Sequence, residues 1–389
     1  MMQNRNNQKT VQSTNFKNFD DMELQNELLR SIYSVGFDKP SSIQQQAIEP
    51  MAKGKSIIVQ SPPGTGKTLI FIIGTLQQIN SENNNCQVII LVPTPELVFQ
   101  TQDIIVKFSQ YLDIGCFASF CIPSMKNIKQ AMKEGFHVII GTPKSIGDMI
   151  DIDFINPETI QILVLDEADE LLSNELREQT LSIHSKLPKS VQIGIFTDIM
   201  TQEIYDFSNE FMNDAMKFIE QENDAVGCIK QFYIDCNYNE FKIDTLVDLY
   251  QVVSVNQSVV FCNSKNTAQE IESRLTSHNY RVDMIHEDMS IEEKCNVIMN
   301  FKQGSVRILV ATDIVDRGIQ LNQVSLVVNY DLPFSDIDYF RRAGKAARFG
   351  RKGITLDMIT TNEMKRIKQL EKMFNCKIEP LPKNFMNYL

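Results

Sequence analysis

The sequence predicts an α/β protein of two tandem domains, each a mostly parallel sheet covered by helices. Three observations lead to this prediction. From Phe16 onward, short β-branched runs alternate with amphipathic helical stretches, as in chains that form parallel sheets. This series runs twice, and a polar stretch without periodicity separates the two halves at 220–227. The length of 389 residues also fits two domains of ordinary size better than one.

The expected strands are apolar runs bounded by turn-forming residues. In the first half they are Ser56–Gln60, Gln87–Val92, Cys116–Cys121, His137–Gly141, Gln161–Leu165 and Val191–Phe196. In the second half they are Lys230–Cys236, Ser258–Cys262, Arg281–His286, Val306–Ala311, Ser325–Asn329 and Gly353–Ile359. Helical patterns lie between them, for example over Pro95–Tyr111 and Ser290–Gln303.

These elements divide the chain into four parts. Residues 1–15 are rich in Asn and Gln, and we expect them to be disordered. We expect the first domain at 16–219, a linker at 220–228 and the second domain at 229–389. Two α/β domains that are joined in this way form a cleft, which is where a ligand site is expected.

Composition narrows the class of protein. Apolar residues make up 43% and charged residues 22%, which is typical of a folded soluble chain. The net charge of −11 argues against binding nucleic acid through bulk charge, although a local basic groove stays possible. The 8 cysteines form no C-x-x-C pair and suit reduced thiols in a cytoplasmic or nuclear protein. Without a signal pattern or a long apolar run, we expect neither secretion nor a membrane span.

One stretch has the pattern of a phosphate-binding loop. It follows the strand expected at Ser56–Gln60, leads into an apolar helix, and reads Ser61-Pro62-Pro63-Gly64-Thr65-Gly66-Lys67-Thr68. The glycines let consecutive N–H groups point at phosphate oxygens, and the helix N-terminus adds partial positive charge. Lys67 is expected on the β- and γ-phosphates, and the Thr68 hydroxyl on Mg²⁺. The alternative is an ordinary glycine-rich turn between a strand and a helix.

Two adjacent acids follow the apolar run Ile162-Leu163-Val164-Leu165. We expect Asp166 to hold Mg²⁺ and Glu167 to orient or deprotonate the attacking water. The alternative is an acidic turn after a buried strand, and for such a motif alone this interpretation is correct about half the time. The loop at Gly64 to Thr68 favours the catalytic interpretation.

Asp166-Glu167-Ala168-Asp169 resembles the signature of the DEAD-box RNA helicases. Gly36-Phe37-Asp38-Lys39-Pro40-Ser41-Ser42-Ile43-Gln44 is similar to their adenine-reading Q motif, with Phe19 at the offset of the aromatic that stacks on the base. The resemblance spans Phe16 to Leu389 and is strongest to the eukaryotic initiation factor 4A group, including its exon-junction paralogue. It implies two RecA-like domains that close over ATP, Mg²⁺ and single-stranded RNA. It also places Lys39, Pro40 and Gln44 at the nucleotide.

The first half departs from this family at positions that face RNA. Pro95 stands where the family has Arg, and Pro123-Ser124 where it has a Gly pair. Lys144-Ser145 replaces Gly-Arg, and Lys144 can partly replace the lost cation. Thr94, Thr142 and Lys144 are therefore the RNA candidates left here, and each lost phosphate contact is expected to weaken binding.

The family's Ser-Ala-Thr motif, which links hydrolysis to strand separation, aligns with Thr197-Asp198-Ile199. Ile199 cannot supply the hydroxyl that the motif carries at its end. Asp198 adds a negative charge near Asp166 and Asp169.

Thr94 can cap the helix that Pro95 begins.

The second half departs as well. The resemblance implies RNA contacts for Asn263, Lys294 and Thr312, but Glu287 stands where the family has Gly. Gln320 replaces an Asp that contacts the ATP ribose. The last motif reads Arg341-Arg342-Ala343-Gly344-Lys345-Ala346-Ala347-Arg348, in which Arg342, Lys345 and Arg348 are the catalytic candidates and Lys345 replaces an arginine that reaches the γ-phosphate.

Three functions fit this pattern. The first is a working ATP-dependent RNA helicase, expected as a monomer, with weakened RNA grip and unwinding. The second is an ATP-binding scaffold in a ribonucleoprotein or translation-factor complex, with a helical-repeat protein as partner. The third is an AAA-type ATPase, which the second α/β half and Asp166-Glu167-Ala168-Asp169 count against.

Overall fold

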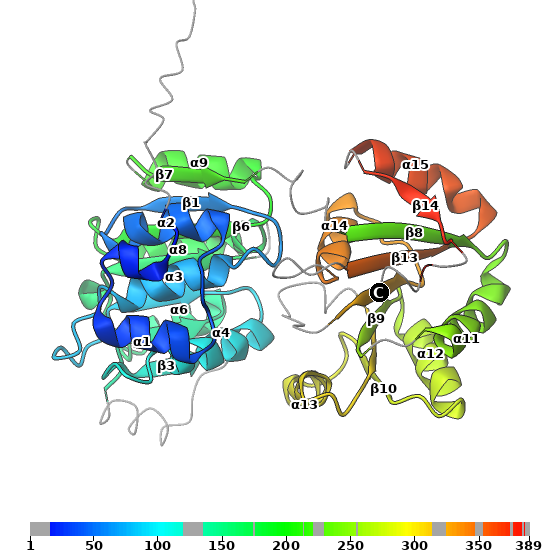
Figure 1. Ribbon diagram of the computed structural model, residues 1–389. Coiled ribbons are helices and arrows are strands. Elements are labelled where there is room, and N and C mark those ends of the chain that lie inside the picture. Colours follow the sequence, from blue (N-terminus) through cyan, green and yellow to red (C-terminus); the bar gives the residue numbers. More distant parts are fainter. Residues whose placement is uncertain are drawn as a thin grey trace, which may run out of the picture.

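The computed structural model describes residues 16–119, 135–173, 176–212, 214–220, 229–253, 256–312, 324–346, 353–373, 376–382 and 385. Within these ranges the chain forms two seven-stranded sheets in which every pair of neighbouring strands is parallel. In Figure 1 the two domains lie side by side, each with helices packed on its sheet. The predicted fold class, two tandem RecA-like domains, is confirmed.

The first sheet has the strand order β3-β4-β2-β5-β6-β1-β7. Its strands are β1 (Ile57–Gln60), β2 (Val88–Leu91), β3 (Cys116–Ser119), β4 (Val138–Gly141), β5 (Ile162–Asp166), β6 (Gln192–Thr197) and β7 (Met216–Ile219). Its helices are α1 (Asn26–Ser34), α2 (Ser42–Ala52), α3 (Lys67–Leu76), α4 (Pro95–Phe108), α6 (Pro143–Asp151), α7 (Ala168–Leu171), α8 (Arg177–Lys186) and α9 (Gln202–Phe211), with short 3-10 turns at Phe19–Met22 and Pro157–Thr159.

Both faces of the first sheet are buried, because successive side chains of a strand point to opposite faces. Ile57 and Val59 of β1 join the core beneath α1 to α4, whereas Ile58 joins the core beneath α6 to α9. Thr94 caps α4 as expected, since its hydroxyl accepts from the Leu97 N–H at 3.4 Å. Pro95 is the first residue of that helix, where a missing N–H costs nothing.

The second sheet has the order β10-β11-β9-β12-β13-β8-β14. Its strands are β8 (Ile229–Asp235), β9 (Ser258–Phe261), β10 (Val282–Ile285), β11 (Ile308–Ala311), β12 (Leu326–Asn329), β13 (Gly353–Ile359) and β14 (Ile378–Pro380). Its helices are α11 (Lys242–Val252), α12 (Lys265–Ser277), α13 (Ile291–Lys302), α14 (Asp336–Gly344) and α15 (Met364–Met373), with 3-10 turns at Asn239–Phe241 and Thr361–Glu363.

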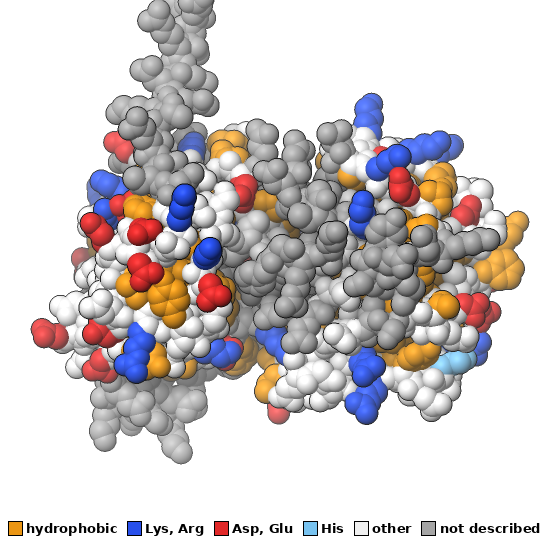
Figure 2. Space-filling model, in the orientation of Figure 1, with side chains coloured by type: hydrophobic (Ala, Val, Ile, Leu, Met, Phe, Trp, Pro, Cys, Tyr) orange, Lys and Arg blue, Asp and Glu red, His pale blue; other side chains and the backbone are white. Residues whose placement is uncertain are grey.

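Helix α14 lies on the side of the second domain that faces the first domain (Figure 1). On the face shown in Figure 2, Lys and Arg side chains of the described residues are scattered among Asp and Glu rather than gathered in one basic field. Among the helices that the structure describes, none is long and apolar enough to cross a membrane.

Candidate active site

The turn between β1 and α3 has the backbone of a phosphate-binding loop. Gly64 and Gly66 have φ angles of 81° and 91°, a region that side-chain-bearing residues adopt only at a cost. A Cβ atom on Gly66 would also lie 2.2 Å from Nε2 of Gln44. Both glycines are therefore required by the local backbone. Gly66 caps α3, so the positive end of the helix dipole faces the loop.

Side chains within the loop hold this shape. Ser61 is fully buried, and its hydroxyl donates to a Glu220 carboxylate oxygen at 2.9 Å and also contacts the Thr65 hydroxyl. The Thr65 hydroxyl in turn contacts the Pro62 carbonyl at 2.8 Å. Thr68 lies in the first turn of α3 and is half-buried. The sequence showed no reason to expect Glu220, the last residue before the undescribed segment 221–228, at the phosphate loop.

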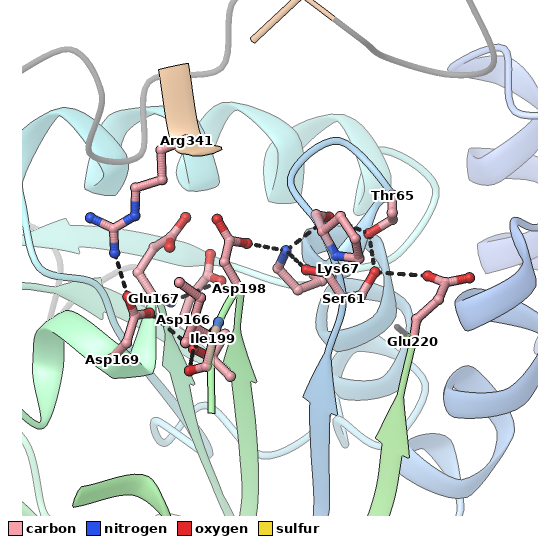
Figure 3. Close-up of polar contacts among 12 residues, drawn as sticks. Ser61, Thr65, Lys67, Asp166, Glu167, Asp169, Asp198, Ile199, Glu220 and Arg341 are labelled. Carbon is pink, nitrogen blue, oxygen red and sulfur yellow. Dashed lines mark hydrogen bonds and ion pairs between the residues drawn. The ribbon is translucent and has the colours of Figure 1, made fainter. Parts of the chain in front are cut away.

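Strand order brings three chemical groups to one edge of the first sheet. β6 lies between β1 and β5, with Gln60 opposite Thr197 and Asp166 opposite Phe196. The carboxyl ends of these parallel strands therefore present the phosphate loop, Asp198 and Asp166 side by side, which Figure 3 shows. Crevices at such strand ends are where α/β sheets bind ligands.

Lys67 is the centre of this group. Its amine donates to the Ser61 carbonyl at 2.6 Å, to the Pro62 carbonyl at 3.2 Å and to the Asp198 carboxylate. Lys67 and Asp198 are 8% and 6% exposed, so the ion pair is shielded from water. Burial works against the charged amine, but Asp198 and the neighbouring acids outweigh it and raise the pKa of Lys67.

The two signature acids lie beyond Asp198. Asp166 ends β5 and is buried, and burial raises its pKa to about 7, with Lys67 opposing and Asp198 adding to the shift. Burial and then Asp198 raise the pKa of Glu167 well above its usual range. The expected negative charge of Asp198 near these acids is confirmed. Several acids so close together favour the binding of a cation, because its positive charge offsets their mutual repulsion.

The oxygen donors suit Mg²⁺, which prefers hard oxygen ligands and usually takes only one or two carboxylates besides phosphate oxygens and water. Asp166 and the Thr68 hydroxyl supply ligands of this kind. Among the described residues no group of three or more His, Cys, Asp or Glu side chains forms a metal cage of its own.

Arg341 of α14 reaches across to the first domain. Its guanidinium binds the Asp169 carboxylate (Figure 3) and, at 3.0 Å, that of Glu170. Asp169 also accepts from the Thr197 hydroxyl at 2.9 Å. The two arginine-bound acids and Thr197 thus connect the strand end that carries Asp198 to the second domain.

The end of α14 approaches the phosphate loop itself. A Cβ atom on Gly344 would lie 2.9 Å from Cγ of Pro63. Lys345 follows directly and is 6% exposed, in an enclosed position next to this contact. Arg342 is fully buried within the second domain, where it donates to Asn263 at 3.1 Å and to the Asp331 carbonyl at 2.8 Å. A catalytic role for Arg342 stays a prediction, and the contacts seen here are structural.

The adenine-reading candidates form part of the loop's support. Gln44 is 3% exposed, its amide donates to the Gly66 carbonyl at 3.0 Å, and its oxygen accepts from the Ser41 N–H at 2.8 Å. Phe19 is fully buried and packs edge-on against Tyr33, so this structure does not present its ring to a base. Lys39 is exposed, whereas Pro40 is buried. Base recognition by these residues stays a prediction.

The RNA candidates of the first domain sit at helix starts. Thr94 caps α4, Thr142 precedes α6, and Lys144 is exposed in the first turn of α6. Ser145 is 4% exposed and its hydroxyl contacts that of Ser119. An arginine at 145 would therefore be forced into a packed position, so the family's lost cation cannot simply be restored there.

The RNA candidates of the second domain are held by internal partners. Glu287 accepts from the Thr312 hydroxyl at 3.1 Å through its carboxylate and from the Lys294 amine at 3.0 Å through its carbonyl. Asn263 donates to the Leu332 carbonyl at 2.9 Å and accepts from Arg342. Glu287, which replaces a glycine of the family, is thus in contact with two of the groups expected to bind RNA.

Several sequence candidates lie outside the described residues. These are Gln320, Arg348, the Pro123-Ser124 pair and all of the expected linker except Glu220. Three residues absent from the sequence-based site lie at it: Arg341, Asp198 as the partner of Lys67, and Glu220 as the partner of Ser61. The position of Arg341 in its motif was a usable signal, whereas nothing in the sequence placed Asp198 against Lys67.

Comparisons with known proteins agree with this geometry. The family model of the DEAD/DEAH box helicase matches residues 41–207, and that of the helicase conserved C-terminal domain matches residues 241–350. The chain is 37% identical over 374 residues to eukaryotic initiation factor 4A of Caenorhabditis elegans, covering 96% of this chain and 93% of the relative. It is 39% identical over 367 residues to ATP-dependent RNA helicase eIF4A of Pyricularia oryzae, covering 94% and 93%.

Solved structures show the same architecture. The Saccharomyces cerevisiae protein Dbp5 bound to RNA and ADP BeF3 superposes with a TM-score of 0.85 at 30% identity, covering 96% of this chain and 97% of that one. A Dbp5 variant bound to Nup159, a Gle1 variant, IP6 and ADP has a TM-score of 0.69 at 29% identity, covering 93% and 96%.

Proposed function

The chain belongs to the DEAD/DEAH box helicase family, and from this premise we propose that it hydrolyses ATP to act on single-stranded RNA, with a weakened grip on the RNA and weakened strand separation. The observation that carries the proposal is that the phosphate loop after β1 and Asp166 at the end of β5 lie at the same edge of the sheet, with β6 between them, and that α14 of the second domain contacts the loop through Gly344 and Asp169 through Arg341. We assign this activity to a monomer in the cytoplasm or nucleus.

In this mechanism the first domain binds the nucleotide. The backbone N–H groups of the loop and Lys67 hold the phosphates, while Thr68 and Asp166 would hold Mg²⁺, whose positive charge would offset the charge of the phosphates. Glu167 orients the attacking water and accepts its proton. The raised pKa of Glu167 leaves it protonated more readily before a cation is present, so its basic form depends on a complete site.

The second domain completes the site only when the domains meet. Lys345 and Arg348 bring positive charge to the terminal phosphate, and lysine supplies a point charge where arginine would supply a planar fork. Arg341 ties this arrangement to Asp169, which the Thr197 hydroxyl holds in turn.

The expectation of a weak RNA grip rests on two contacts and one missing cation. Glu287 occupies the Thr312 hydroxyl and the Lys294 amine, and Pro95 removes a cation from the start of α4. RNA phosphates would compete with the Glu287 carboxylate for Thr312 while being repelled by it. Binding is therefore expected to be weak and only modestly dependent on salt.

A second candidate function rests on the Lys67–Asp198 pair. A phosphate-loop lysine with a buried carboxylate partner suits a site that turns ATP over slowly. In that case the chain is an ATP-binding scaffold that holds a ribonucleoprotein or translation-factor complex together, with a helical-repeat protein as its partner.

The test is the ATPase rate of the purified chain with and without single-stranded RNA, beside a duplex-unwinding assay. Stimulation by RNA supports the helicase. ATP that stays bound, with no stimulation of its hydrolysis by RNA, supports the scaffold. Lys67→Ala is the control that removes phosphate binding in both cases.

A further inference from the structure

We propose that Asp198 is a specificity-determining residue of the nucleotide site: it competes with the terminal phosphate of ATP for Lys67 and so shifts the preference of the site toward ADP. The inference rests on the proposed nucleotide-binding role of the loop. It concerns a residue that stands where the family has the Ala of its Ser-Ala-Thr motif.

All three N–H donors of the Lys67 amine already have acceptors. A lysine ammonium carries three N–H groups. In this structure those three meet the Ser61 carbonyl, the Pro62 carbonyl and the Asp198 carboxylate. A phosphate oxygen can reach Lys67 only by replacing one of them. The two carbonyls belong to the loop backbone, so the side chain of Asp198 is the partner that can leave.

Leaving is unfavourable for Asp198. Its carboxylate is 6% exposed, so it cannot turn into bulk water without rearrangement. Besides Lys67, the ionisable groups that interact with Asp198 at this sheet edge are Asp166, Glu167 and Asp169, and the pKa of each is raised mainly by burial and further by Asp198. A displaced Asp198 therefore faces like charges instead of an ammonium.

This cost falls more on ATP than on ADP. Phosphate-loop lysines reach the β- and γ-phosphates. ADP ends at the β-phosphate, so it offers fewer phosphate oxygens to Lys67 and brings less negative charge toward Asp198. ADP can thus bind while the ion pair largely persists, whereas ATP has to break it. The same competition favours release of ATP over release of ADP.

The experiment measures dissociation constants for ADP and for a non-hydrolysable ATP analogue by calorimetry, with excess Mg²⁺, on the full chain. Asp198→Asn keeps the shape of the side chain and removes its charge, and Asp198→Ala removes the partner altogether. Asp206→Asn, at an exposed position on α9, removes the same charge elsewhere in the first domain. Thermal unfolding checks that each variant is folded.

Both Asp198 variants are expected to bind the ATP analogue about ten- to a hundredfold more tightly, which is the usual effect of one charged hydrogen bond, and ADP by clearly less. Asp206→Asn should leave both constants unchanged. Equal tightening for the two nucleotides, no change, or weaker binding of the analogue would each overturn the proposal. If Lys67→Ala also left nucleotide binding intact, the proposed nucleotide site itself would be wrong, which is a separate failure.

Discussion

Arg341 of the second domain forms a buried ion pair with Asp169 of the first, and both side chains are 7% exposed. The guanidinium of Arg341 stays protonated at any physiological pH, so its side of the ion pair keeps its charge. The contact lies one residue from Arg342 and three residues from the Asp166 that is expected to hold Mg²⁺. It therefore links the position of α14 directly to the catalytic edge of the first sheet.

Arg341→Gln should weaken closure of the two domains. Removal of one partner of a buried ion pair leaves the other charge uncompensated, at a cost of about 3–5 kcal/mol in the closed state. Energy transfer between dyes on the two domains, with RNA and a non-hydrolysable ATP analogue, should show fewer closed molecules. The control is Arg366→Gln, which breaks an arginine–aspartate pair within the second domain. Equal closure in both variants would show that the Arg341 contact is incidental.

Gly344→Ala should impair closure by a steric route. The new Cβ would lie 2.9 Å from Cγ of Pro63, and overpacking of this kind costs about 1–3 kcal/mol. RNA-stimulated ATP turnover should fall by about tenfold, while ADP binding to the first domain stays unchanged. Gly147→Ala is a matched control, because a Cβ there meets no atom within 4 Å. Full activity of Gly344→Ala would mean that α14 and the loop do not need to approach this closely.

Asp357 predicts a pH dependence of stability. It is fully buried and accepts from Asn329 at 2.7 Å and from Tyr339 at 2.8 Å, and burial raises its pKa to about 6. Between about pH 4 and pH 6 the folded chain keeps a proton that the unfolded chain has lost. The contribution of Asp357 to the free energy of unfolding therefore falls as pH rises through this window, by about 3 kcal/mol in total, and does not change above it.

Asp357→Asn should remove that fall. The free energy of unfolding of the second domain, measured by urea titration from about pH 4 to pH 7, should decline less steeply in the variant than in the unmodified chain. Asp206→Asn, an exposed change, should keep the original profile. Parallel profiles for Asp357→Asn and the unmodified chain would show that this carboxyl does not hold its proton on folding.

Glu287→Gln and Glu287→Gly should strengthen RNA binding. Both free the Thr312 hydroxyl from a carboxylate, and the glycine variant restores the residue typical of the family. The affinity for a single-stranded oligonucleotide should rise by about tenfold. Glu292→Gln, an exposed change on α13, serves as the control for loss of one negative charge. If the affinity rose equally in the control, the effect would come from the change in net charge alone.

Pro95→Arg should steepen the salt dependence of RNA binding. One added phosphate contact raises the log–log slope by roughly 0.7 for single strands. Pro95→Ala separates the new cation from the loss of proline, and both variants keep Thr94 as the helix cap. An unchanged slope with an intact fold would place the start of α4 outside the RNA path.

Much of the fold could be predicted from the sequence, because both sheets are buried on two faces and their strands read as continuous apolar runs. All twelve expected strands match strands of the structure within its described residues. The two strands that were missed are β7 and β14, which lie at sheet edges. β7 carries Lys217 among its apolar residues and β14 ends in Pro380, and such residues are tolerated at an edge but weaken a strand pattern.

The individual motifs were also visible in the sequence, but their contacts were not. The pairing of Lys67 with Asp198 depends on β6 lying between β1 and β5, and strand order is not encoded in any local pattern. The contact of Thr312 with Glu287 likewise joins residues 25 positions apart. Asp198 and Glu287 each stand where the family has a different residue, and each contacts a side chain that is expected to bind ATP or RNA.

The most direct test of the proposed function is ATP hydrolysis by the unmodified chain, with and without single-stranded RNA at low salt, beside Glu167→Gln. The account predicts hydrolysis that RNA stimulates and that Glu167→Gln abolishes while ATP binding is kept. ATP that stays bound and unhydrolysed in the presence of saturating RNA would contradict it and would leave the scaffold as the function of this chain.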